Sequence, residues 1–78
     1  MQLLENQQIA TFKVLHAEHP EKAGDCFIEI RQWETVDGKQ IELVVEHGQM
    51  DLFGEVITSC MVMPFHFTVP EVLERLNS

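Results

Sequence analysis

Two stretches in the middle of the chain alternate apolar and polar side chains and flank an Asp-Gly dipeptide. They cover residues 25–36 and 39–47, with Asp37 and Gly38 between them. A period of two is typical of strands that bury one face, and Asp-Gly favours a two-residue type I′ turn because both turn positions need a positive φ. The pattern therefore predicts an antiparallel hairpin.

The predicted turn fixes a register, which sorts the hairpin side chains onto two faces. The pairs expected on the core face are Ile28 with His47, Ile30 with Val45, Gln32 with Leu43, and Glu34 with Ile41, with Cys26 extending that face. The opposite face would carry Phe27, Glu29, Arg31, Trp33, Glu42, Val44 and Glu46. Because a slip of one residue would exchange the two faces, the assignment of every hairpin side chain to a face depends on this register.

Three further segments complete the expected sheet. Residues 9–16 favour a strand by their β-branched and aromatic content. Residues 56–62 also favour a strand, although Asp51 as a helix N-cap and the apolar spacing that follows it fit a helix as well. Pro64 then implies an edge position or a bend, and residues 65–67 are expected to be a short extended piece. Residues 1–8 fit either a short helix or a frayed end.

The end of the chain carries the signals of a helix. Thr68 and Glu71 have the spacing of a capping box, and Pro70 is tolerated in a first helical turn. One apolar stripe is formed by Val69, Val72, Leu73 and Leu76. We expect a helix over residues 69–76 that packs on the core face of the sheet, because so short a helix needs tertiary contacts to be stable.

The predicted fold class is therefore α+β: a small antiparallel sheet of three to five strands with a short C-terminal helix on one face. A small barrel closed by the strand after Gly54, with a terminal helix, is the alternative. The 78 residues form one domain, 1–78, because no repeat or linker divides them.

Charge and composition exclude several partners. The formal net charge is −8, so phosphate backbones and anionic membranes should repel the chain. The sequence has neither a signal peptide nor an apolar run long enough to span a bilayer. We therefore expect a cytoplasmic protein in which Cys26 and Cys60 are reduced, buried thiols.

Candidate chemistry is weak along the whole sequence. The histidines that could bind a metal are His16, His19, His47 and His66, but their spacing does not direct them to one point. Glu29 and Glu46 form the one carboxylate pair whose proximity follows from the register, and a flat sheet face gives them no pocket. We expect Arg31, which lies diagonal to Glu46 and on the same strand face as Glu29, to neutralise this pair in a surface ion cluster. We predict no catalytic residue and no cofactor, and a metal-binding protein or metal-dependent enzyme remains the alternative.

The outer face of the hairpin is the better candidate site. Aromatic residues and arginine are enriched where proteins bind one another. We expect a non-catalytic interaction or regulatory module, which binds a protein partner or forms a homodimer through Phe27, Arg31, Trp33, Glu42, Val44 and Glu46. Accessory proteins of phages and mobile elements are commonly small, acidic and β-rich, and such a protein or an inhibitor of a larger protein is among the expected functions. The alternative for this face is that residues 1–8 or 50–63 cover it.

Overall fold

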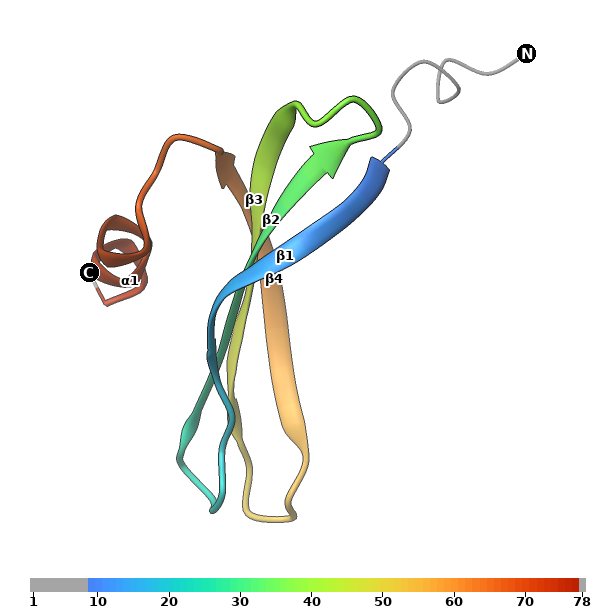
Figure 1. Ribbon diagram of the computed structural model, residues 1–78. Helices are drawn as coiled ribbons and strands as arrows, with labels where there is room; N and C mark the ends of the chain where they lie inside the picture. Colours follow the sequence, from blue (N-terminus) through green and yellow to red (C-terminus); the bar gives the residue numbers. More distant parts are fainter. Residues whose placement is uncertain (1–8, 78) are drawn as a thin grey trace.

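The computed structural model describes residues 9–77, which form a twisted four-stranded sheet and one helix (Figure 1). The elements are β1 (Ile9–Glu18), β2 (Cys26–Thr35), β3 (Gln40–Met50), β4 (Val56–Pro64) and α1 (Val69–Leu76). Each strand pairs antiparallel with the next in the order β1-β2-β3-β4. The α+β prediction is confirmed, and the barrel alternative is not supported because β1 and β4 are the two edges of an open sheet.

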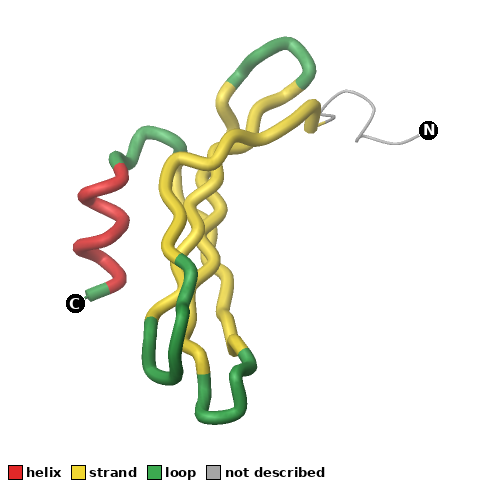
Figure 2. Tube along the Cα trace, turned by 60° about the horizontal axis from the view of Figure 1, so that its bottom comes forward, coloured by secondary structure: helices red, strands yellow, loops and turns green. Residues whose placement is uncertain are grey.

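α1 forms over the predicted residues for the predicted reasons. The Thr68 side chain accepts the Glu71 N–H, and the Glu71 side chain accepts the Thr68 N–H at 2.9 Å, which completes the capping box. Val72 is fully buried, and the rest of the apolar stripe packs around the same core. The helix lies along one face of the sheet, as Figure 2 shows.

The core is the layer between α1 and strands β2 to β4. Its fully buried members are Ile30, Leu43, Val45 and Val72, and Met63 is nearly so. Cross-strand pairs join Ile30 to Val45 and Val45 to Met61, so these side chains share the face that α1 covers. The predicted core face is thereby confirmed.

The turn between β2 and β3 differs from the predicted one. The Gly38 N–H donates to the Thr35 carbonyl, and the Thr35 N–H donates to Lys39, so three residues separate the closing pair. Only Gly38 has a positive φ there, +86°, whereas a type I′ turn would need one at Asp37 too. The type I′ prediction is wrong, because this geometry is that of a turn followed by a glycine bulge.

A second irregularity restores the predicted register. Glu34 pairs with Gln40 instead of Ile41, and Trp33 pairs with Glu42, so Ile41 is an extra residue in β3. The turn shifts the pairing of β2 with β3 by one residue, and the extra residue Ile41 shifts it back. From Trp33 to Ile28 the pairs are therefore those predicted. The predicted Glu34–Ile41 pair is the one that fails.

The segment between β3 and β4 contains a tight loop, and β4 is a strand as the sequence favoured. Asp51 does not cap a helix. Its Oδ1 atom accepts the N–H groups of Phe53 at 2.8 Å and Glu55 at 2.9 Å, and Gly54 has a φ of +85°. After Pro64, Phe65 and His66 form a turn closed by the Phe67 N–H on the Pro64 carbonyl, so the extended piece expected there is absent. The prediction for residues 1–8 lies outside the described residues.

Candidate interaction surface

The face of the sheet opposite α1, called the outer face below, has no described element packed on it (Figure 1). Residues 50–63 belong to the sheet and its β3–β4 loop, so they do not cover this face. The alternation along each strand directs side chains here from β1, β2, β3 and β4. The predicted outer residues of β2 and β3 lie on it, because their register is the expected one.

Five apolar side chains from all four strands gather on one part of the outer face. Phe12 pairs with Trp33, while Val14, Val44 and Val62 belong to the neighbouring row, in which Arg31 sits between Val14 and Val44. We call Phe12, Val14, Trp33, Val44 and Val62 the apolar outer patch. Phe12 is 41%, Val14 48% and Val62 59% exposed, values typical of surface positions rather than of a core.

A bulge in β1 places two of these residues. Val14 pairs with Arg31 and His16 with Ile30, so Leu15 is an extra residue between them. On the outer face lie Phe12, Val14 and Ala17, whereas Lys13 and His16 lie on the face that α1 covers. Phe12 and Val14 were not among the predicted site residues, because the sequence does not fix the register of β1 against β2. The sequence does carry a signal for these two residues, because Phe12 and Val14 flank Lys13 and this alternation places both apolar side chains on one face of a strand.

Arg31 connects the patch to a row of carboxylates. Its guanidinium forms ion pairs with Glu29 and, at 3.6 Å, with Glu46, and it lies 5.4 Å from the centre of the Phe12 ring. Glu46 also accepts the Thr58 hydroxyl at 2.9 Å. The two opposed carboxylates are therefore held by one arginine, as the sequence analysis expected for a surface ion cluster.

Trp33 is more enclosed than its neighbours. Its ring lies 4.8 Å from that of Phe12, and its indole N–H is buried without an acceptor among the described residues. Trp33 therefore packs against Phe12 and contributes to the stability of the sheet as well as to the exposed surface. A truncation of Trp33 would reduce stability too.

Phe27 lies apart from the patch. Six positions separate it from Trp33 along β2, which corresponds to about 20 Å at ~3.3 Å per residue. The His19 ring stacks on Phe27 with 5.4 Å between centroids. The prediction that Phe27 and Trp33 belong to one site is therefore only partly right, because both lie on the outer face but the ion cluster around Arg31 separates them.

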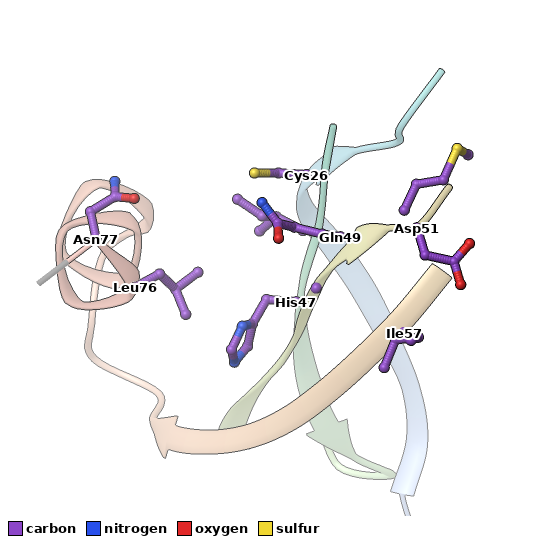
Figure 3. A pocket seen from close by; sticks show the side chains of 10 residues that line it. Cys26, His47, Gln49, Asp51, Ile57, Leu76 and Asn77 are labelled. Atoms are coloured by element: carbon purple, nitrogen blue, oxygen red, sulfur yellow. The ribbon is translucent and has the colours of Figure 1, made fainter. Parts of the chain in front are cut away.

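A groove of about 550 Å³ opens on the other face, where the sheet extends past the end of α1 (Figure 3). Leu76 and Asn77 form its helix side, and Cys26, His47 and Gln49 lie on the sheet side (Figure 3). Cys26 and His47 form no hydrogen bond with each other in this described region. The groove therefore brings a thiol and an imidazole to one surface without the contact that would activate a nucleophile.

Both cysteines are free and exposed. The prediction that they are buried is wrong, because Cys26 lies at the start of β2 beyond the cover of α1, and Cys60 faces outward on an edge strand. A strand side chain is buried only where the face to which it points is covered.

The four histidines do not converge. Within residues 9–77, no group of three or more His, Cys, Asp or Glu side chains is arranged to hold a metal ion. His16 instead contacts Glu18 at 2.7 Å, His19 stacks on Phe27, and His66 belongs to the turn before α1. His47 points to the core face beside Ile28, as predicted.

The β3–β4 loop presents two apolar side chains that the sequence analysis did not place on the surface. Leu52 is 88% and Phe53 89% exposed. Asp51 holds this loop through its bonds to the Phe53 and Glu55 N–H groups. The spacing of Leu52 and Phe53 relative to the apolar residues that follow also fitted a buried helical stripe. Spacing alone does not distinguish a buried apolar pair from an apolar pair at a loop tip.

The chain has no significant match among protein-family models, curated proteins or solved structures. The described residues contain no helix with the length and apolar character required to cross a bilayer. The candidate surface is therefore interpreted from its own geometry.

Proposed function

We propose that this protein is a non-catalytic interaction module that binds a partner protein through the apolar outer patch. The observation that carries the proposal is the exposure of Phe12, Val14 and Val62 on a sheet face that no described element covers. Contiguous exposed apolar side chains with a polar border are characteristic of protein-binding surfaces.

The charges around the patch specify the chemistry of the partner. Glu29 and Glu46 share Arg31, whereas Glu42, which pairs with Trp33 and with Pro64 at the border of the patch, has no ion-pair partner in the described part of the chain. The net charge of the chain is −8. A complementary surface would combine apolar side chains with Lys or Arg residues at its rim, and its approach would be accelerated by electrostatic attraction.

A cytosolic location belongs to the same proposal. Cys26 and Cys60 are both free thiols, and exposed thiols persist in a reducing compartment. A regulator or an inhibitor that binds a larger protein would need no more chemistry than this surface supplies.

The proposal is tested with two lysine substitutions on opposite faces. Val14→Lys places a charge in the patch, and Gln49→Lys makes the same charge change at an exposed position on the other face. Peptides selected from a random displayed library for binding to the unaltered protein should contain aromatic and basic residues. Their affinity should fall at least tenfold for Val14→Lys and stay unchanged for Gln49→Lys.

Two results would contradict this function. One is a set of selected peptides that bind Val14→Lys as well as the unaltered protein. The other is the loss of binding in Gln49→Lys alone, which would move the site to the groove beside α1. Circular dichroism of both variants checks that each is folded.

A further inference from the structure

The two edges of the sheet differ in their protection. β1 carries Lys13, His16 and Glu18 and is interrupted by the bulge at Leu15. β4 contains nine residues, none of them charged, and pairs only with β3 among the described strands. Charged side chains and bulges are the usual devices that prevent a sheet edge from pairing with another chain. The β4 edge lacks both.

The β3–β4 loop reveals which backbone groups of β4 face this edge. The Asp51 N–H donates to the Glu55 carbonyl at 2.8 Å, so these residues form a hydrogen-bonded pair. Such pairs alternate with non-hydrogen-bonded pairs along an antiparallel ladder. The residues of β4 at non-hydrogen-bonded positions are Val56, Thr58, Cys60, Val62 and Pro64. Their backbone groups point away from β3, and Pro64, which has no N–H, falls in this set.

We propose that β4 pairs antiparallel with β4 of a second copy across a two-fold axis, joining two sheets into one. The arrangement that overlaps the whole of Val56–Pro64 places Cys60 opposite itself and Thr58 opposite Val62. A two-fold interface requires a surface that is complementary to itself, and an unpaired antiparallel edge meets this condition through its backbone alone.

The absence of charged side chains along β4 allows a second copy to approach at this edge. Two molecules of net charge −8 repel each other, but the paired strands would bring no charged side chain of β4 into contact. Glu46, which pairs with Cys60, would lie three strand spacings from its equivalent, about 14 Å. This separation exceeds the Debye length of about 8 Å at physiological salt, so the repulsion is largely screened.

The pairing leaves the apolar outer patch open, because it extends the sheet sideways and covers neither face. It is therefore independent of the function proposed above. Val14→Lys should not change the mass of the protein in solution, whereas a change at the β4 edge should.

The test measures mass by sedimentation velocity for the unaltered protein, Val62→Pro and Val62→Thr. The Val62 N–H points to the free edge, so proline removes a donor that β3 does not use and places its ring where the second copy would pair. Threonine keeps the N–H and the β-branched shape. We expect twice the chain mass of 9.0 kDa for the unaltered protein and for Val62→Thr, and the single mass for Val62→Pro.

A monomeric unaltered protein at every concentration overturns the proposal, and so does a Val62→Pro protein that dimerises as well as the unaltered one. If circular dichroism shows that Val62→Pro is unfolded, Val62→Lys replaces it with the same expected loss of mass. Hydrogen exchange gives an independent readout, because the Thr58, Cys60 and Val62 amides should exchange more slowly as the concentration rises.

Cys60 supplies a direct check of the register. Opposed residues in a hydrogen-bonded pair have Cα atoms about 5.5 Å apart, which a disulfide can span. In a Cys26→Ser protein, mild oxidation should convert the dimer into a covalently linked one that reductant separates. A sample that is dimeric by mass and yields no Cys60 cross-link overturns the β4 interface.

Discussion

Arg31 offsets the repulsion between two glutamates on the outer face of the sheet. Glu29 and Glu46 oppose each other across β2 and β3, an arrangement that is unfavourable for like charges, and Arg31 contacts both. The same guanidinium lies over the Phe12 ring. One side chain therefore links the carboxylate row to the apolar outer patch. The contact with the carboxylates follows from the predicted hairpin register, whereas the contact with Phe12 depends on the register of β1, which the sequence did not predict.

Single residues also explain where sequence-based prediction succeeded and failed. The residues of α1 were predictable because Thr68 and Glu71 are a local capping signal. The turn at Asp37 was misassigned because an Asp-Gly dipeptide fits both a type I′ turn and a type I turn with a glycine bulge. The bulge residue Ile41 had no signal of its own, yet it returns the register to the predicted one.

Gly48 is a position at which the sheet leaves no room for a side chain. A Cβ atom at this position would lie 1.9 Å from the Ile57 carbonyl oxygen, which is backbone of β4 and cannot move independently. We expect Gly48→Ala to reduce the free energy of unfolding by about 3 kcal/mol or more, because the two strands would have to separate.

The measurement for Gly48→Ala is urea unfolding followed by circular dichroism. Gly54→Ala is the control: Gly54 has a φ of +85° and open space around it, so alanine there should cost only about 1 kcal/mol of backbone strain. Equal losses in the two variants would show that β3 and β4 do not approach as closely as described.

At the scale of elements, α1 and β4 have different stability requirements. α1 is an eight-residue helix that depends on its cap and on burial of one stripe against the sheet. The inner edge of β4 pairs with β3, and none of the described strands pairs with its outer edge. Pro64 predicted an edge position or a bend for this strand, and β4 is an edge of the described sheet. The backbone groups that this edge leaves unpaired were not predicted, because they depend on the register with β3.

The helix cap gives α1 a pH dependence with a definite sign. The Thr68 backbone N–H and then its hydroxyl donate to the Glu71 carboxylate and hold its pKa below the ordinary 4.5. A carboxyl with a lowered pKa in the folded state stabilises the fold fully above its unfolded pKa. That stabilisation is lost as the pH falls through the folded-state pKa.

Glu71→Gln isolates this contribution, because glutamine can occupy the same capping position without a charge. We expect the variant to be less stable than the unaltered protein at neutral pH and the difference to shrink as the pH falls well below 4.5. Urea midpoints at a series of pH values give this difference. A difference that stays constant into acid would mean that the Glu71 charge does not act on the cap.

At the scale of the whole molecule, one helix shields one side of a four-stranded sheet, and no other element of residues 9–77 covers the second side or the β4 edge. The dimensions of 46 × 27 × 17 Å describe a flat, elongated body, and its helix of eight residues is only about 12 Å long. So short a helix covers part of one face only, so that the outer face and the β4 edge have no described element on them. The sequence predicted the layers correctly, but which apolar residues remain exposed depends on how much of the sheet so short a helix can cover.

The outer face, opposite α1, is accessible to solvent in the described structure, and the exposure of four valines measures this accessibility. Val14 and Val62 are 48% and 59% exposed, whereas Val45 and Val72 are fully buried. A soluble paramagnetic reagent should broaden the methyl NMR signals of Val14 and Val62 strongly and leave those of Val45 and Val72 almost unchanged. Equal protection of all four valines at a concentration where the protein is monomeric would contradict the account, because the outer face would then be covered by the chain itself.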